Sequence, residues 1–254
     1  MILRPAQDAS VRRAQDADAR AQGVDARAQG EEVPRWLNSL TAALGQRERL
    51  ANVAALRPAL GDRARQAAVL ILIGDSANGP EIMFVERAPT LRTHAGQIAF
   101  PGGAHDPDDV DLADTALREA AEETGLDRTG VHVLGALPPV HVAVSGFDVT
   151  GVVAWWQRRS SVSAADVEEV ASVWMVAVGD LVDPLHRAQV QHPSGYTGPA
   201  FEVAGHLIWG LTAHLLNGVL DLAGWQQPWD RTRIVEIPTR YLTDRRDLGG
   251  PDAH

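Results

Sequence analysis

Residues 113–125 read ADTALREAAEETG. Alanine and leucine recur at helical spacing in this segment, so it predicts a helix over 112–124 that ends at the final glycine. At about 100° per residue, Glu119, Glu122 and Glu123 point to one side of this helix, opposite a face rich in alanine. Like charges at this spacing disfavour a helix, and more so near its C-terminal end. A hard divalent cation such as Mg²⁺ would compensate them; the alternative is a solvated acidic face.

The residues around these glutamates form a longer pattern. Residues 118–126, REAAEETGL, resemble the second half of the Nudix box, Arg-Glu-U-x-Glu-Glu-x-Gly-U with U aliphatic, at every position. Upstream, Gly103 is followed by five residues and Asp109, and then by eight residues and Arg118. The general box has a glutamate in place of Asp109 and one residue fewer before the arginine. The resemblance implies a hydrolase of nucleoside diphosphates linked to another group, with Mg²⁺ or Mn²⁺ as cofactor.

The segment before the box narrows this resemblance. Residues 87–103, RAPTLRTHAGQIAFPGG, are similar to the signature of the coenzyme A (CoA) pyrophosphatase branch of the Nudix hydrolases. The longer spacing inside the box, residues 169–170 and residues 208–213 resemble the same branch. The resemblance covers roughly residues 35–222.

The branch implies a particular reaction. It is hydrolysis of the diphosphate bond of CoA or acyl-CoA derivatives, which gives adenosine 3′,5′-bisphosphate and 4′-phosphopantetheine or its acyl derivative. One alternative is a Nudix hydrolase of another nucleoside diphosphate derivative, such as ADP-ribose or NADH. Another is a Nudix-fold binding module without turnover, which loss of the box carboxylates would favour.

The resemblance also implies catalytic and metal-binding roles. Glu119, Glu122 and Glu123 would be metal ligands, or one of them would activate the water. Glu119 and Glu123, one turn apart, are the expected direct pair. Arg118 would orient one of these carboxylates, since its planar fork can hold two oxygens; a simple intrahelical salt bridge is the alternative.

Residues of the preceding segment are candidates for substrate binding. Arg87 and Arg92 suit the substrate's phosphates, because arginine is permanently charged and binds oxygens in pairs. The alternative for both arginines is surface charge or an ion pair with a neighbouring glutamate. His94 could donate to a phosphate or be a polar surface residue. Gly102 and Gly103 supply backbone freedom where the loop passes the metal and phosphates.

The remaining acidic candidates lie outside the helix. The general base could lie on the segment 157–169, where Glu168 and Glu169 are the candidates, or in the box itself. A charged start of a strand is the alternative for both. Asp106 and Asp109 could contact the metal through water or belong to a polar loop that caps the helix.

Hydrophobic patterning predicts one mixed α/β layer structure. The resemblance implies an α/β (α+β) fold, a Nudix-type α/β/α sandwich with a mixed β-sheet. The predicted domain spans 34–235, after a flexible low-complexity tail (1–33) and before a mobile C-terminal tail (236–254). Residues 88–111 are expected to be mostly loop, and Trp209 to be a core residue. Strands are predicted at 67–73, 81–86, 131–137, 140–144, 147–156 and 170–176, and a second helix at 206–222.

Composition excludes several classes of protein. The 254 residues contain no cysteine and no lysine, so thiol catalysis, Schiff-base lysines and P-loop NTPases are excluded. The net charge of −10 argues against broad nucleic-acid binding. No apolar run approaches the ~20 residues of a membrane span. We therefore expect a cytoplasmic protein with a small nucleotide diphosphate substrate and no membrane partner; a homodimer is compatible with the sequence.

Overall fold

The computed structural model describes residues 32–54, 64–143, 145–193 and 195–242. Helical structure begins directly after Pro34. It consists of η1 (Arg35–Leu37), α2 (Asn38–Leu44) and α3 (Arg47–Ala54).

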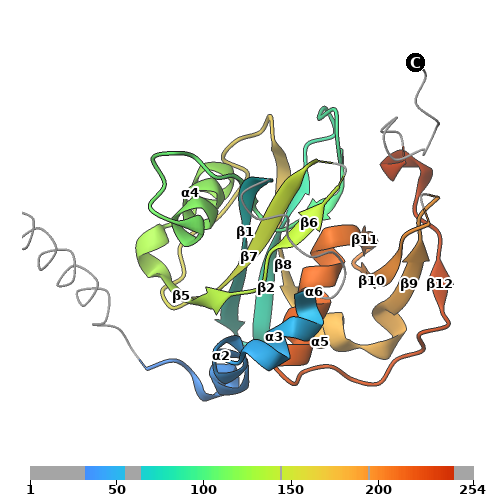
Figure 1. The fold of residues 1–254 in the computed structure, drawn as a ribbon, viewed down its shortest axis with the longest axis horizontal. Coiled ribbons are helices and arrows are strands. Elements are labelled where there is room, and N and C mark those ends of the chain that lie inside the picture. The colour runs from blue at the N-terminus through green and yellow to red at the C-terminus, as the bar shows by residue number, and fades with distance from the viewer. Residues whose placement is uncertain (1–31, 55–63, 144, 194, 243–254) are drawn as a thin grey trace, which may run out of the picture. The chain divides into compact units, whose positions relative to one another are not determined.

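A mixed sheet of eight strands forms the centre of the fold (Figure 1). The apolar run 67–73 lies in β1, which forms an antiparallel hairpin with β2 and pairs in parallel with β7. The strand order is β3-β2-β1-β7-β5, while β4 pairs with β1, β6 with β7 and β8 with β2. The strands are β1 (Arg65–Ser76), β2 (Gly79–Arg87), β3 (Ile98–Ala99), β4 (Gly102–Ala104), β5 (Val131–Ala136), β6 (Val140–Val142), β7 (Phe147–Trp156) and β8 (Val170–Ala177).

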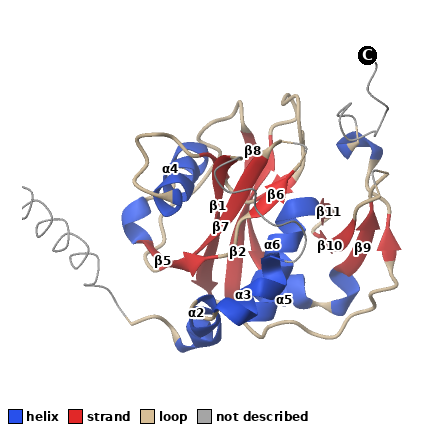
Figure 2. Cartoon of the chain, in the orientation of Figure 1, coloured by secondary structure: helices blue, strands red, loops and turns tan. Residues whose placement is uncertain are grey.

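Helices cover both faces of this sheet. On one face lies α4 (Leu112–Thr124), whose fully buried Ala116 and Ala120 belong to one apolar cluster with Leu70 of β1. On the other face lies α6 (Gly210–Leu222), whose Leu215 side chain packs within 3.6 Å of a β-carbon position at Gly151 of β7. The fold is therefore the expected α/β/α sandwich with a mixed sheet (Figure 2).

A second sheet of four strands follows, in the order β11-β10-β9-β12. Its strands are β9 (Arg187–Gln191), β10 (Thr197–Val203), β11 (His206–Ile208) and β12 (Ile234–Val235). The short helices are η3 (Arg128–Gly130), α5 (Val178–Val182), η4 (Pro184–His186) and η5 (Thr239–Tyr241).

Three predicted boundaries need correction. The helix expected over 206–222 begins only at Gly210, because residues 206–208 form β11 after a two-residue turn at Ala204 and Gly205, both with positive φ. The segment 88–111 contains β3 and β4, which are too short to show a period in the sequence. The strand expected over 140–144 ends at Val142.

The two predicted tails lie largely outside the described residues. Residues 1–31 of the predicted N-terminal tail and 243–254 of the C-terminal tail are not described. Within 236–242, Ile237 and Tyr241 are buried in a cluster with Ala188 and Val190 of β9. Packed structure therefore continues beyond residue 235.

In the described part of the chain, every helix is too short or too polar to cross a membrane.

The end of α4 provides a test of the backbone conformation. Gly125 ends the helix with φ +70°, and a β-carbon there would meet no neighbour closer than 4.0 Å. Gly125→Ala should therefore lower the free energy of unfolding by about 1 kcal/mol through backbone strain alone. Urea unfolding measures this loss.

Gly179→Ala is the matched control, because Gly179 lies in α5 with open space around its β-carbon position and no positive φ. It should change stability by no more than about 0.5 kcal/mol. Equal losses in the two variants would contradict the assigned helix end.

Candidate active site

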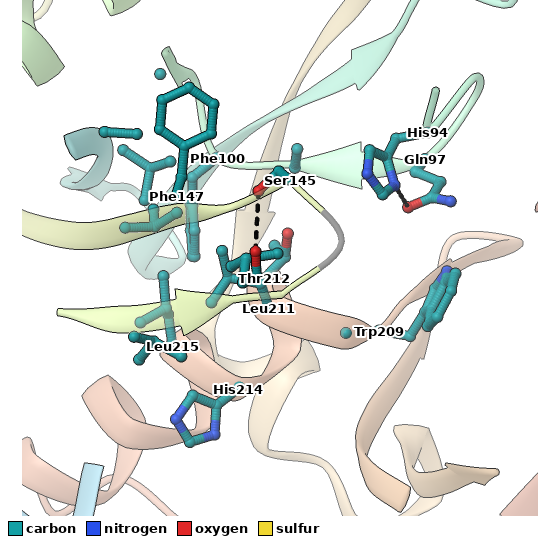
Figure 3. A pocket seen from close by; sticks show the side chains of 18 of the residues that line it. His94, Gln97, Phe100, Ser145, Phe147, Trp209, Leu211, Thr212, His214 and Leu215 are labelled. Carbon is teal, nitrogen blue, oxygen red and sulfur yellow. Dashed lines mark hydrogen bonds between the residues drawn. The ribbon is translucent and has the colours of Figure 1, made fainter. Parts of the chain in front are cut away.

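An open cleft of about 510 Å³ lies between the main sheet and the start of α6 (Figure 3). Its walls come from β1, the segment 87–104, the β6–β7 hairpin, His192, Tyr196 and the first turns of α6. No aspartate or glutamate occurs among the described residues that line it, although the whole chain has a net charge of −10. The cleft therefore suits a ligand with anionic and apolar parts.

Arg87 and His94 contribute polar groups to this cleft. Both line it, and the half-buried Arg87 has a buried Nε without a hydrogen-bond partner among the described residues. The segment between them folds back, since the amide of Arg87 donates to the carbonyl of Gln97 at 3.0 Å and the amide of Gly96 to the carbonyl of Arg87 at 3.0 Å. This closed loop places residues of the predicted substrate-binding segment on the cleft wall.

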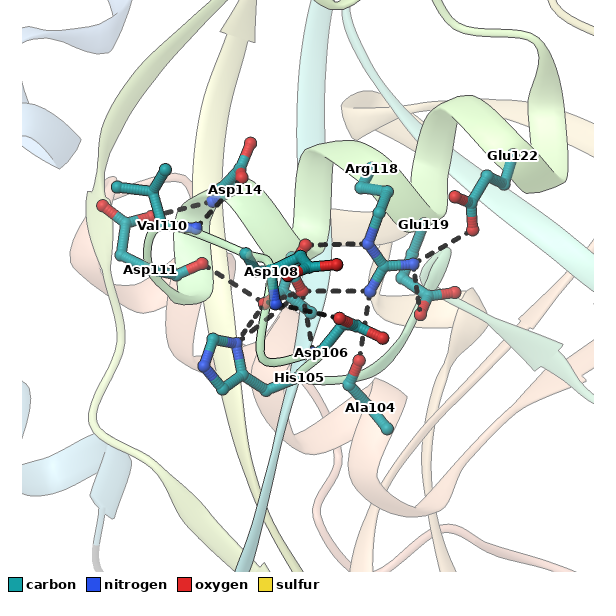
Figure 4. A network of polar contacts seen from close by, with 12 residues as sticks. Ala104, His105, Asp106, Asp108, Val110, Asp111, Asp114, Arg118, Glu119 and Glu122 are labelled. Carbon is teal, nitrogen blue, oxygen red and sulfur yellow. Dashed lines mark hydrogen bonds and ion pairs between the residues drawn. The ribbon is translucent and has the colours of Figure 1, made fainter.

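Arg118 organises the polar side of α4 (Figure 4). Its Nε and Nη2 donate to the two carboxylate oxygens of Asp109 at 2.8 and 3.0 Å. Its Nη1 donates to Glu119 and Glu122, both at 3.0 Å, and Nη2 also donates to the carbonyl of Ala104 at 3.2 Å. The interaction with Arg118 holds the pKa of Asp109 well below its usual range. Arg118 therefore forms an intrahelical pair and also ties the loop before α4 to the helix.

Gly102 and Gly103 lie directly against two of the glutamates. A β-carbon on Gly103 would lie 2.5 Å from the carboxyl carbon of Glu119. The amide of Gly102 donates to Glu123 Oε2 at 3.1 Å, and a β-carbon on Gly102 would lie 2.3 Å from the carbonyl oxygen of Ala68. A β-carbon on Gly102 would collide with backbone, and one on Gly103 would displace the Glu119 carboxylate, so the two glycines allow β4 to lie against both β1 and α4.

The three glutamates of the box have different surroundings. Glu123 is almost completely buried, with 3% of its surface exposed, and burial raises its pKa to about 8. Burial also raises the pKa of Glu119, against the opposing effect of Arg118. Glu122 is exposed and points away with its carboxylate on Arg118. The expectation that all three would point outward together is therefore wrong for Glu123.

Further charges act on these carboxylates. Glu169, just before β8, raises the pKa of both Glu119 and Glu123, whereas Arg87 lowers the pKa of Glu123. The structure thus brings Glu169, Arg87 and the two buried carboxylates into one electrostatic site.

This site has the chemistry for a divalent cation. Within the described residues no three acidic, histidine or cysteine side chains already converge as a preformed metal site, because Arg118 and the amide of Gly102 hold the carboxylates of α4. Even so, the carboxylates of Glu119 and Glu123 lie together against β4, and Glu119 raises the pKa of Glu123. They form a hard oxygen donor set, which Mg²⁺ or Mn²⁺ would stabilise. Glu119, Glu123 and Glu122 are the residues that would hold the ion.

Several positions differ from the expectation. Arg92 is exposed and does not line the cleft, so a contact with substrate there has no support from the geometry. Asp106 accepts from the amide of Asp108, and the cap of α4 is Asp111, which accepts from the amide of Asp114 at 2.8 Å. Asp106 and Asp109, the two acids of the loop before α4, therefore both have hydrogen-bond partners within the protein.

Sequence reasoning missed one wall of the cleft. Trp209, expected in the core, is half-buried and lines the cleft together with His192 and Tyr196. Leu211 and Thr212 of α6 lie on the same wall. These residues are distant in sequence and show no common period. The folding of the second sheet and the start of α6 brings them to the same cleft. This α/β/α sandwich thus places two glutamates against a glycine strand beside an open cleft.

Comparison with known proteins assigns the family. The family model of the NUDIX domain matches residues 64–194. A Yersinia pestis (strain Pestoides F) protein described as an uncharacterized Nudix hydrolase NudL is 38% identical over 163 residues, 60% of this chain and 77% of that protein. A NUDIX hydrolase structure from Nitrosomonas europaea is 13% identical, covers 69% of this chain and 81% of its own, and has a TM-score of 0.43. The NUDIX domain of Shewanella oneidensis NrtR, solved with ADP ribose, is 18% identical over 52% of this chain and 84% of its own, with a TM-score of 0.39.

The family model and the Yersinia relative carry the assignment. The chain belongs to the Nudix hydrolases, which hydrolyse nucleoside diphosphate derivatives and generally use divalent metal ions.

The two glycines should respond differently to substitution. Gly103→Ala meets only the flexible end of Glu119, so the protein should fold while hydrolysis falls at least about 100-fold, because the carboxylate must move. Gly102→Ala meets the backbone of β1 and should cost several kcal/mol of stability. Urea unfolding and initial rates with Mg²⁺ measure the two effects. Full activity in Gly103→Ala would contradict the close packing of Glu119.

Glu123 should make the metal-free protein less stable at high pH. Its folded-state pKa of about 8 lies above the ordinary value of 4.5, so the folded state keeps a proton that the unfolded state releases. This contribution is complete below pH 4.5 and is lost as pH rises through 8. In EDTA the loss should be on the order of 4 kcal/mol for wild type and absent in Glu123→Gln, which stays neutral.

Urea unfolding at pH 5, 6.5 and 8 measures this difference, and Glu122→Gln is the control because Glu122 is exposed. If the free energy of unfolding depends on pH equally in the wild-type protein and in Glu123→Gln, Glu123 ionises normally.

Proposed function

We propose that this Nudix hydrolase cleaves the diphosphate bond of CoA or acyl-CoA derivatives, with Mg²⁺ or Mn²⁺ as cofactor. The products are adenosine 3′,5′-bisphosphate and 4′-phosphopantetheine or its acyl derivative. One observation carries the proposal: the segment 87–103, which resembles the CoA pyrophosphatase signature, forms a wall of the cleft and ends on the two glutamates of α4.

The chain's own residues have distinct parts in this reaction. Arg87 lies between the cleft and Glu123, so its guanidinium is placed to bind an oxygen of the diphosphate. His94, on the same wall, is a second donor for a phosphate oxygen. Arg118 holds Glu119 in place from the side away from Gly103. These contacts orient the diphosphate relative to the carboxylates.

The metal and the base complete the proposal. A divalent ion bound by Glu119, Glu122 and Glu123 would neutralise charge on the phosphates and lower the pKa of a bound water. Glu169 is exposed and interacts electrostatically with Glu119 and Glu123, so it is our candidate for the group that accepts the proton from water. Glu168, which is also exposed before β8, is the alternative candidate.

A substrate panel tests this assignment. Purified protein is given CoA, acetyl-CoA, octanoyl-CoA, ADP-ribose, NADH and a nucleoside triphosphate, each with Mg²⁺ and with Mn²⁺, and the products are identified by mass spectrometry. We expect the highest kcat/KM for a CoA compound and release of adenosine 3′,5′-bisphosphate. A higher kcat/KM for ADP-ribose or NADH would overturn the assignment of CoA as substrate. Absence of turnover for every compound would favour a binding module.

Glu119→Gln is the control for contaminating activity in this panel. Its carboxylate lies on Gly103 and Arg118, and the neutral amide would lose the charge that holds the metal. Turnover should fall at least about 100-fold for every substrate, with circular dichroism unchanged.

A further inference from the structure

The cleft has two chemically different sides (Figure 3). His94, Gln97 and Trp209 lie on one side, and Phe147 and Leu215 on the other. The lining also includes the aliphatic residues Ile98, Val140, Val142, Val149 and Leu211. A ligand that fills the cleft must therefore have a polar part and an extended apolar part.

The polar side offers hydrogen-bond donors that have no acceptor. The side-chain nitrogens Gln97 Nε2, Trp209 Nε1 and Arg87 Nε are buried and have no partner among the described residues. His94 fixes the amide of Gln97, because its Nδ1 lies 3.3 Å from Gln97 Oε1 and leaves the NH₂ group for another partner. A buried donor without an acceptor costs about 1–3 kcal/mol. A ligand with carbonyl or phosphate oxygens would recover that energy.

The aromatic rings of the cleft already have partners on one face. Trp209 stacks on His192, with ring centroids 5.7 Å apart and an interplanar angle of 15°. Phe100 stacks on Phe84 at 4.9 Å, and Arg65 lies 4.1 Å from the ring centroid of Phe147. One face of each of these three rings is therefore occupied within the protein. Among the apolar residues that line the cleft, aliphatic side chains outnumber aromatic ones.

Part of the cleft wall comes from a segment of the chain outside the general family match. The NUDIX domain model matches residues 64–194, whereas Trp209, Leu211 and Leu215 follow it. Strand β11, directly before α6, contacts β3 and so brings this segment to the cleft. This added wall can thus select one Nudix substrate over others.

We propose that this cleft binds the acyl-pantetheine half of the substrate, and that Leu211 determines specificity for the acyl group. The acyl chain packs along Leu211, Val142 and Phe147, while carbonyl oxygens of the pantetheine arm accept hydrogen bonds from Gln97 and Trp209. The adenosine bisphosphate half then lies on the other side of the α4 carboxylates, outside the cleft. This inference rests on the proposed CoA substrate.

Binding of the two half-molecules tests the assignment. The probes are octanoyl-4′-phosphopantetheine and adenosine 3′,5′-bisphosphate, titrated separately into the full chain by calorimetry with Mg²⁺. Leu211→Trp narrows the cleft at a half-buried position and should weaken binding of the octanoyl probe at least about 10-fold. It should change the affinity for adenosine 3′,5′-bisphosphate by less than about 2-fold.

Leu185→Trp is the matched control, because Leu185 is 79% exposed and does not line the cleft. It should bind both probes as wild type does. Leu211→Gln replaces the tryptophan variant if that variant fails to fold. It nearly keeps the side-chain volume but removes apolar surface, so it should give the same selective loss of octanoyl-probe binding. Thermal unfolding checks that each variant is folded.

The outcomes separate this inference from the proposed function. The wild-type protein could hydrolyse CoA compounds while both Leu211 variants weaken binding of the two probes equally, or weaken neither. The proposed function would then hold, but the cleft would bind another ligand. Selective loss of adenosine 3′,5′-bisphosphate would assign the cleft to the nucleotide half and overturn the inference. Wild-type protein that binds no octanoyl probe would overturn it too. Failure of the proposed function appears separately, as absence of CoA turnover in the substrate panel.

Discussion

The close approach of β4 to α4 is the constraint on which the site depends. Gly103 has no room for a β-carbon beside Glu119, and Gly102 has none beside the backbone of Ala68. Only two successive glycines allow a strand to pair with β1 while two carboxylates lie on it. The small, fully buried Ala116 and Ala120 let the helix come equally close to the sheet. Backbone contact distances thus place the glutamates before any ligand binds.

Electrostatics then makes this arrangement functional. A nearly buried carboxylate such as Glu123 is costly when ionised, and Glu119 and Glu169 increase that cost. Arg118 compensates part of the negative charge on the helix, and it also holds Asp109 of the preceding loop. The remaining charge would favour a divalent ion at this place. A cation stabilises both the folded site and the substrate phosphates, which the net negative charge of the protein would otherwise repel.

Two parts of the chain contribute to substrate selection. The segment that matches the family supplies the sheet, α4 and the wall with Arg87 and His94. The second sheet and α6 supply further lining residues, among them Trp209 and Leu211. Because the α4 carboxylates lie in the first part, the second part could select the group attached to the diphosphate under the proposed function. This separation agrees with a family that acts on one bond in many substrates.

The sequence by itself determined the elements whose signals are local. The helix 112–124, its glycine stop, the long apolar strand of 67–73 and the glycine pair before the box follow from residues close together in the chain. Short strands such as β3, β4 and β11 escaped prediction because two or three residues show no period. Only the tertiary structure decided that Glu123 is buried while Glu122 is exposed, that Arg92 is outside the cleft and that Trp209 is in its wall. These properties depend on the packing of segments distant in sequence, as in the bond from the Gly102 amide to Glu123, and no local pattern encodes that packing.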